Sequence, residues 1–171
     1  MTPQEYEHTS FPDLDREYRD GEVIDRSKPD SVHGRAQALA GAFFGPLRKT
    51  TSIYPCIGTR AKLREGLIRI PDVSVFSEAP QKNLPDTPPL IAIEILSLDD
   101  RFVAVRSKLE EYRTWGVPHV WLIDPDLRRL YKCDEGLAEV TSLELPEFGV
   151  TRSRRPTSSS SYRHSSLVVT H

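Results

Sequence analysis

The sequence has few cysteines and no long run of apolar residues. Its 171 residues include two cysteines, Cys56 and Cys133, which stand far apart and form no CxxC or Cys/His spacing. This spacing argues against a disulfide-rich scaffold and a zinc ribbon, and it favours a reducing compartment. No window approaches the roughly 20 apolar residues that cross a membrane, and the first residues lack the basic and apolar regions of a signal peptide. We therefore expect a cytoplasmic protein with no membrane partner.

A large excess of charge of one sign is also missing. The chain has 23 Lys and Arg against 25 Asp and Glu, which gives a formal net charge of −2. The charge is unevenly distributed, because residues 152–171 contain four arginines and no acid, which leaves 19 basic and 25 acidic residues in 1–151. A mild excess of acidic residues over positions 1–151 is not typical of a protein that coats nucleic acid.

The length predicts one domain with short extensions. Domains commonly have about 100 to 200 residues, and about 150 residues bury enough surface to need no disulfide or structural metal. Residues 1–15 are polar and lack periodicity, so we expect a flexible lead-in. Residues 16–150 carry the patterns of a folded domain. Residues 151–171 are rich in serine and arginine, so we expect a disordered tail.

Apolar residues at helical spacing predict a helix in the first third of the domain. It starts at Ser31, a plausible N-cap, and continues to about Phe44. The Gly45-Pro46 pair should kink or end it.

The second half of the domain predicts a βαβ unit. A strand at 90–96, a helix at 102–115 that Gly116 closes, and a strand at 119–123 follow one another, so the two strands should be parallel. Other strands are expected at 22–25, in a hairpin formed by 53–63 and 67–76, at 129–133 and near 138–143. Together these elements predict an α/β fold, with a mixed β-sheet flanked by helices in a single domain.

Two acidic residues stand in strands that are otherwise largely apolar. Glu94 is the only non-apolar residue of Leu90–Leu96, and burying its carboxylate is costly unless a cation or a metal meets it. By strand alternation, Asp72 shares a face with Ile70 and Ser74. Two carboxylates on neighbouring strands can share a divalent cation such as Mg²⁺. Two plainer interpretations stay open: Glu94 paired with an arginine at an exposed strand end, and Asp72 as a turn residue.

Lys108 is the third candidate. On the helix of 102–115 it shares a stripe with Val105 and Tyr112, so it borders the buried face. If it turns toward Glu94, its ammonium can orient a nucleophile and offset charge that develops on a phosphate. A solvated surface lysine is the alternative.

Several ordered motifs give the sequence a resemblance to a known family. In chain order they are Ile70-Pro-Asp-Val-Ser-Val75, Ile93-Glu-Ile-Leu-Ser97, Lys108-Leu-Glu-Glu-Tyr112 and Gly116-Val-Pro-His-Val-Trp-Leu-Ile-Asp-Pro125. Upstream stand the acidic turn Tyr18-Arg-Asp-Gly-Glu22 and His33, at the head of the first helix. Over about residues 16–149, the chain resembles the bacterial putative restriction endonuclease family of the PD-(D/E)XK nuclease superfamily.

The resemblance implies a restriction-endonuclease-like fold and a metal-dependent phosphodiesterase. Asp72 and Glu94 match the two acids of the family motif, and with the backbone carbonyl of Ile95 they would hold Mg²⁺ or Mn²⁺. Leu96 stands where related nucleases have a lysine, and Lys108 on the following helix is the residue in the replacing position.

The resemblance extends to two further positions and has two departures. Glu22 matches an acidic position that would supply a second metal or water ligand, and His33 is a candidate for a role near the substrate. The family commonly has a proline where Leu98 stands. It also usually continues with a short strand and a helix after the position of Gly149, where this chain becomes rich in serine and arginine.

The leading hypothesis is a Mg²⁺- or Mn²⁺-dependent endonuclease acting on DNA, with homodimer formation left open. Phosphate contacts are expected from the basic hairpin, unless that hairpin is only a solvated surface; its residues are Arg60, Lys62, Arg64 and Arg69. A catalytically inactive nuclease-fold module, kept for binding or assembly, is the alternative that Leu96 and the tail favour. A nuclease acting on RNA or branched DNA is also open, because no motif reads a base edge.

Overall fold

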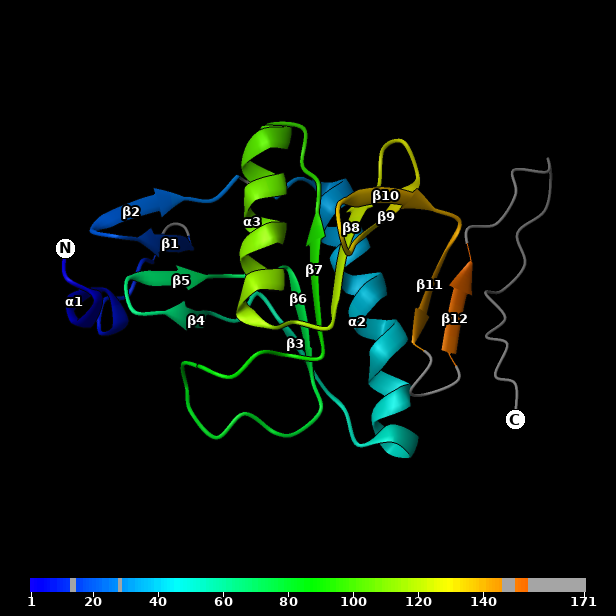
Figure 1. Cartoon of the computed structure of the whole chain (residues 1–171), viewed down its shortest axis with the longest axis horizontal. Helices are drawn as coiled ribbons and strands as arrows, with labels where there is room; N and C mark the ends of the chain where they lie inside the picture. Colours follow the sequence, from blue (N-terminus) through cyan, green and yellow to red (C-terminus); the bar gives the residue numbers. More distant parts are fainter. Residues whose placement is uncertain (13–14, 28, 146–149, 154–171) are drawn as a thin grey trace.

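A six-stranded mixed sheet forms the centre of the molecule, and helix α3 (Phe102–Trp115) packs on one of its faces (Figure 1). The sheet order is β10 (Leu137–Val140), β9 (Arg129–Cys133), β8 (His119–Asp124), β7 (Ile91–Ile95), β6 (Val73–Phe76) and β3 (Tyr54–Ile57). The computed structural model describes residues 1–12, 15–27, 29–145 and 150–153. β7 and β8 are parallel and α3 connects them, whereas the other pairs of this sheet are antiparallel. The predicted βαβ unit is therefore confirmed, and so is the mixed α/β fold.

A smaller antiparallel sheet lies beside α3, at the left of Figure 1. Its order is β2 (Glu22–Asp25), β1 (Arg16–Arg19), β5 (Leu67–Arg69) and β4 (Ala61–Arg64). The single hairpin predicted over 53–76 is thus divided between the two sheets. Gly58, at a φ of 56°, and Pro71, which has no N–H for a ladder, stand where the chain passes from one sheet to the other.

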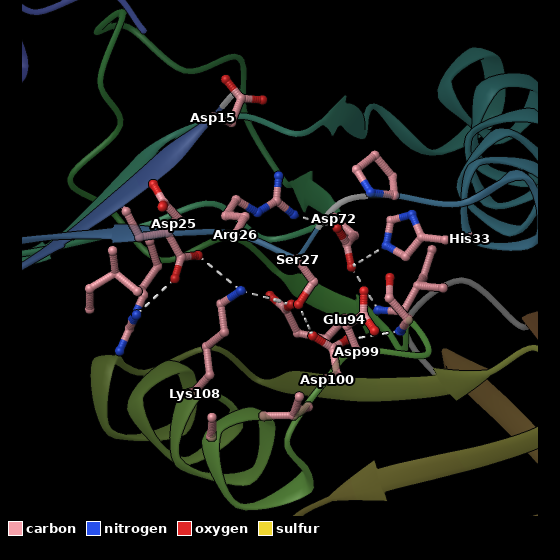
Figure 2. Close-up of a pocket in the computed structure, with 18 of the residues that line it drawn as sticks. Asp15, Asp25, Arg26, Ser27, His33, Asp72, Glu94, Asp99, Asp100 and Lys108 are labelled. Atoms are coloured by element: carbon pink, nitrogen blue, oxygen red, sulfur yellow. Dashed lines mark hydrogen bonds and ion pairs between the residues drawn. The ribbon is translucent and has the colours of Figure 1, made fainter. Parts of the chain in front are cut away.

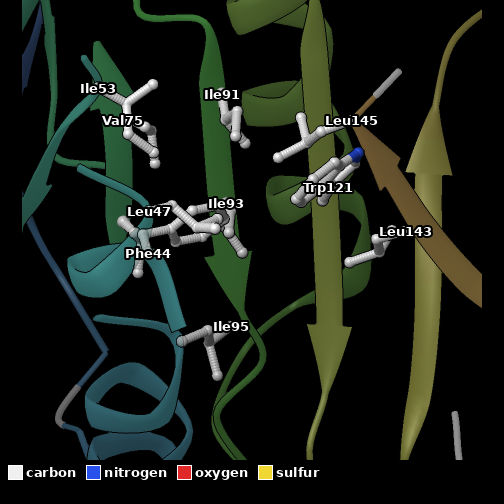
Figure 3. Packing of buried hydrophobic residues seen from close by; sticks show 11 residues of the cluster. Phe44, Leu47, Ile53, Val75, Ile91, Ile93, Ile95, Trp121, Leu143 and Leu145 are labelled. Atoms are coloured by element: carbon white, nitrogen blue, oxygen red, sulfur yellow. The ribbon is translucent and has the colours of Figure 1, made fainter. Parts of the chain in front are cut away.

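The central strand β7 is buried on both faces, and its alternation decides which side chain meets which helix. Ile91, Ile93 and Ile95 pack in the core that includes residues of α2 (Ser31–Thr51), together with Trp121 (Figure 3). Ala92 lies in the opposite core, against residues of α3. Because side chains on a strand alternate, Glu94 follows Ala92 toward α3.

Helix α2 differs from the prediction at both ends. Asp30, and not Ser31, is its N-cap, since the Asp30 carboxylate accepts hydrogen bonds from the first-turn amides. The helix also continues through Pro46 to Thr51, although Gly45-Pro46 was expected to kink or end it. Leu47 is buried in the same core as Phe44, so packing in the last turns stabilises a helix that proline alone disfavours.

The N-terminal residues are more structured than the predicted flexible lead-in. Helix α1 (Pro3–Glu7) has a capping box between Thr2 and Glu5. Its Tyr6 is fully buried, packs on Tyr18 of β1, and donates a hydrogen bond to the backbone carbonyl of Arg16. This contact attaches the segment to the smaller sheet.

Two short strands, β10 and β11, occupy the region near 138–143, where a single strand was expected. β11 (Ser142–Leu145) pairs with β12 (Val150–Ser153), and Leu143 and Leu145 cover Trp121 in the core (Figure 3). β12 therefore includes residues 151–153 of the segment predicted as a disordered tail, and the rest of that segment, 154–171, lies outside the described residues. Over the described part of the chain, none of the helices has the length and apolar content to cross a bilayer.

Candidate active site

A pocket of about 630 Å³ opens where the two sheets, α3 and the start of α2 meet (Figure 2). It brings together residues from several segments between Asp15 and Lys108. Three of the predicted site residues line it, namely Asp72, Glu94 and Lys108. His33, Ile95 and Arg69 line it too, so six sequence-predicted residues meet in one place.

Asp72 lies just before β6, and each of its carboxylate oxygens has a partner. Oδ2 accepts the backbone N–H of Ile95 at 2.7 Å and lies 3.2 Å from Nε2 of His33. Oδ1 accepts a hydrogen bond from the Arg26 guanidinium at 2.5 Å. Burial opposes the charged form, but the His33 hydrogen bond and the charge of Arg26 outweigh it and hold the pKa of Asp72 below its usual value. Asp72 is therefore an ionised carboxylate held against the Glu94-Ile95 peptide.

Glu94 projects from β7 toward α3, and only 6% of its surface is exposed. Its Oε2 lies 2.9 Å from Nζ of Lys108, and its Oε1 accepts a hydrogen bond from the Tyr112 hydroxyl at 2.7 Å. Burial raises the pKa of Glu94 to about 7 against the attraction of Lys108, and the neighbouring charge of Asp72 acts in the same direction as burial. Glu94 is therefore poised to change protonation state near neutral pH.

Glu17 is a site residue that the sequence reasoning missed. It lies on β1, is 4% exposed, and places Oε1 2.9 Å from Nζ of Lys108. The same carboxylate accepts hydrogen bonds from the Ile70 backbone N–H at 2.9 Å and from the Arg69 guanidinium at 2.7 Å. Burial opposes its charge, yet Lys108 and Arg69 keep the pKa of Glu17 below its usual value.

No local signal pointed to Glu17, because it stands in the charged stretch Arg-Glu-Tyr-Arg, where side-chain alternation does not reveal burial. Lys108 bridges Glu17 of the smaller sheet and Glu94 of the larger one, and these two carboxylates raise its pKa although burial opposes them. The lysine is thus a fixed ammonium at the floor of the pocket, and it is not the solvated surface group that the sequence left as an alternative.

The structure places the two upstream candidates differently. His33 is buried, lies against Asp72 through Nε2, and its Nδ1 has no hydrogen-bond partner among the described residues. The hydrogen bond to Asp72 raises the pKa of His33 although burial opposes the charged ring. Glu22 is exposed at the start of β2 and does not line the pocket. The acid that faces Lys108 from this hairpin is Glu17.

Three of the four basic hairpin residues do not line the pocket, and two of these are paired with acids. Lys62 contacts Glu7 and Glu65, and Arg64 contacts Asp20. Arg60 lies over the ring of Tyr6.

Among the four basic residues expected to contact phosphate, Arg69 lines the pocket. Only 6% of its surface is exposed, however, because its guanidinium is paired with the carboxylates of Glu17 and Glu111. Its charge therefore stabilises the acid network, whereas the sequence assigned it to phosphate contact.

Next to Arg26, hydrogen bonds to Asp100 connect two segments that line the pocket. Ser27 donates a hydrogen bond from its hydroxyl to Asp100, and Asp100 also accepts the backbone N–H of Ser97 at 2.8 Å. The loop after β7 is thereby joined to the segment after β2.

The donor atoms at the site suit a hard divalent cation. Asp72 and Glu94 offer carboxylate oxygens, and Ile95, whose carbonyl the resemblance implies as a third ligand, also lines the pocket. In the described residues, no group of three or more His, Cys, Asp or Glu side chains is placed to hold a metal ion. Mg²⁺ is commonly held by one or two carboxylates with water and substrate phosphate supplying the rest, so this oxygen set fits Mg²⁺ or Mn²⁺ and lacks the nitrogen and sulfur ligands of a structural zinc site.

Comparisons with known proteins agree with this fold and indicate a family. A family model described as Uma2, putative restriction endonuclease, matches residues 3–157. A crystal structure of a putative nuclease belonging to DUF820, from Anabaena variabilis ATCC 29413, matches with a TM-score of 0.69 and 24% sequence identity, covering 77% of this chain and 78% of that one. This structural likeness shows the fold. No curated protein matches the chain.

Proposed function

The chain belongs to the Uma2 family of putative restriction endonucleases, and from this premise we propose that it is a metal-dependent endonuclease that hydrolyses phosphodiester bonds in DNA in the cytoplasm. The observation that carries the proposal is the meeting of three residues in one pocket: Asp72 from just before β6, Glu94 from β7 and Lys108 from α3. A bound Mg²⁺ or Mn²⁺ would supply a Lewis acid for the scissile phosphate and would lower the pKa of a water molecule.

The chain's own residues then have distinct tasks. Asp72 and Glu94 would hold the cation with their carboxylate oxygens, aided by the Ile95 carbonyl. The Ile95 N–H and His33 keep the Asp72 carboxylate in position, which is the support that a metal ligand needs.

Lys108 is a positively charged hydrogen-bond donor and not a base, since two carboxylates raise its pKa. Its Nζ lies 2.9 Å from both Glu17 and Glu94. Glu17 therefore keeps the ammonium pointed at the pocket, where it can orient a nucleophilic water and stabilise charge on the phosphate.

One observation favours the inactive nuclease-fold module as a second candidate. Each carboxylate oxygen of Asp72 and Glu94 already has a hydrogen-bond donor from the protein, and two of these donors are the cations Arg26 and Lys108. Such a network is balanced in charge without any added ion.

The test is cleavage of supercoiled plasmid DNA by purified protein, with and without Mg²⁺ or Mn²⁺. We expect divalent-dependent nicking, and a loss of at least about 100-fold in Asp72→Asn, Glu94→Gln and Lys108→Ala, since each removes a charge at the reacting phosphate. The matched controls are Asp126→Asn, Glu135→Gln and Lys49→Ala, whose side chains are exposed away from the pocket and should leave the rate unchanged.

Two results would decide against this assignment. Nicking that persists in Asp72→Asn would show that this site does not catalyse the cleavage. Failure to cut any DNA or RNA, together with no heat of Mn²⁺ binding in calorimetry, would favour the inactive module. Cleavage of RNA in place of DNA would keep the site and change the substrate.

A further inference from the structure

Arg26 is a cation that the sequence did not single out, and it lies directly on an acid of the proposed metal site. Its guanidinium is 2.5 Å from Asp72 Oδ1, and its side chain is 19% exposed. It belongs to the segment between β2 and α2, in which Arg26 and Ser27 form neither helix nor strand. An arginine on such a segment can change its side-chain direction without breaking a ladder or a helix.

The two oxygens of Asp72 are not equivalent. Oδ2 accepts the Ile95 N–H and lies against Nε2 of His33, so both of its lone-pair directions are used within the protein. Oδ1 has the guanidinium of Arg26 as its partner. A cation that binds Asp72 must therefore approach Oδ1, where Arg26 already lies.

A divalent cation and the Arg26 guanidinium cannot both bind Asp72 Oδ1 without strong repulsion between the two positive charges. Mg²⁺ binds carboxylate oxygen at about 2.0 to 2.1 Å, and with the guanidinium nitrogen on the same atom the two positive groups stand within about 5 Å of each other in a largely buried place. Removing the guanidinium from Asp72 leaves a charge that needs another anion, because an unpaired charge in a pocket is unfavourable.

Most acids around Arg26 already have other partners. Lys108 engages Glu94 and Glu17, Arg16 engages Asp25, and Ser27 and the Ser97 backbone N–H engage Asp100. Asp15 and Asp99 also line the pocket. A phosphate entering the pocket offers the planar, bidentate partner that a guanidinium prefers.

Resting on the proposed function, we propose that Arg26 and the divalent cation compete for Oδ1 of Asp72, and that cation binding releases the guanidinium to bind a phosphate of the nucleic acid. Arg26 thereby couples the two events. When the cation binds, the Arg26 guanidinium becomes available to bind phosphate. The acidic pocket therefore gains a positive contact for nucleic acid only after the cation is bound.

The first test measures Mn²⁺ affinity by calorimetry without nucleic acid. Removing a charge-assisted hydrogen bond to Asp72 should tighten Mn²⁺ binding at least about tenfold in Arg26→Ala and Arg26→Gln. Arg101→Ala is the matched control, because Arg101 also lines the pocket but is exposed at the start of α3. Solvent screens its charge, so we expect a change of about twofold at most. Equal affinities in wild type and both Arg26 variants would overturn the proposal.

The second test measures the binding of a labelled DNA duplex by fluorescence anisotropy, with and without Ca²⁺ as a cation that occupies oxygen sites. Ca²⁺ should increase the affinity of the wild type, and this increase should be about tenfold smaller in Arg26→Gln. If Arg26 had a purely structural role, Arg26→Gln would leave the Ca²⁺-dependent increase in DNA affinity unchanged. That result would overturn the proposed phosphate contact.

Thermal unfolding checks that each variant is folded. If the neutral variants do not fold, Arg26→Lys retains the charge but lacks the planar fork, and it should still bind Mn²⁺ more tightly and DNA more weakly than the wild type.

Asp72→Asn separates failure of this inference from failure of the proposed function. Loss of Mn²⁺ binding in Asp72→Asn, with no gain in the Arg26 variants, would reject the competition and keep the metal site. Mn²⁺ binding that is the same in Asp72→Asn as in the wild type would reject the metal site itself, and the competition with it.

Discussion

At the scale of single residues, the most informative group is Glu94, a carboxylate buried in a strand between two hydrophobic cores. A sequence of apolar residues around one acid indicates that the acid needs a cation. The structure supplies the Lys108 ammonium, and the Tyr112 hydroxyl is a second hydrogen-bond donor. These contacts do not fully offset burial, so the pKa of Glu94 rises to about 7 from 4.5. The folded protein therefore holds this proton more tightly than the unfolded chain does.

This shift predicts a pH dependence of stability. The contribution of Glu94 is fully present below the unfolded pKa of about 4.5 and is lost as pH rises through the folded pKa of about 7. Glu94→Gln cannot ionise. Its free energy of unfolding relative to the wild type should therefore increase by about 2 kcal/mol between pH 5 and pH 8.

Urea unfolding in buffer with EDTA at both pH values measures this difference. The exposed Glu135→Gln serves as the control, for which the difference from the wild type should not change with pH. A pH-independent difference for Glu94→Gln would show that Lys108 keeps Glu94 ionised throughout.

At the scale of elements, helix α2 places His33 against Asp72 in its first turn, so its start matters for the site. The Asp30 carboxylate accepts the backbone N–H groups of Val32 at 2.8 Å and His33 at 2.7 Å. Ser31, the N-cap expected from the sequence, is the exposed first residue of the helix. Two adjacent residues can each cap a helix, and the one chosen depends on where the preceding backbone becomes extended.

The two candidate caps can be separated by substitution. Asp30→Ala should lower the free energy of unfolding by about 1 kcal/mol, because two first-turn amides lose their acceptor. Ser31→Ala should change it by less than about 0.5 kcal/mol, as for most exposed positions. Thermal or urea unfolding of both variants makes the comparison. A larger loss in Ser31→Ala than in Asp30→Ala would reverse the assignment of the cap.

At the scale of the whole molecule, the site is the junction of two sheets, and Lys108 is the residue that joins them. It contacts Glu17 of the smaller sheet and Glu94 of the larger one, both largely buried. Lys62 provides a natural comparison, since it also contacts two acids, Glu7 and Glu65, but at the surface.

Removing the ammonium should therefore have very different effects at the two places. Lys108→Met leaves two buried carboxylates without their shared cation, and we expect a loss of about 3 kcal/mol in the free energy of unfolding. Lys62→Met should cost less than about 1 kcal/mol. Urea unfolding with EDTA gives both values, and Glu17→Gln combined with Lys108→Met should recover part of the loss. Equal costs at the two lysines would mean that Lys108 does not bridge the sheets.

The sequence by itself determined the elements of the second half of the domain and the acids at its centre. Periodicity of two and of 3.6 residues is a local property, so β7, α3 and β8 could be predicted, and a lone acid such as Glu94 was visible against apolar neighbours. The resemblance to a nuclease family rested on the same local motifs.

Only the tertiary structure decided which residues complete the site. Glu17 and Arg26 lie in short charged segments whose burial depends on partners far along the chain; Glu17 meets Arg69 52 positions away, and Arg26 meets Asp72 46 positions away. For the same reason, the sequence did not reveal that Arg69 is buried and that Glu22 is exposed outside the pocket. A charged side chain is buried when opposite charges from other elements surround it, and local periodicity does not contain that information.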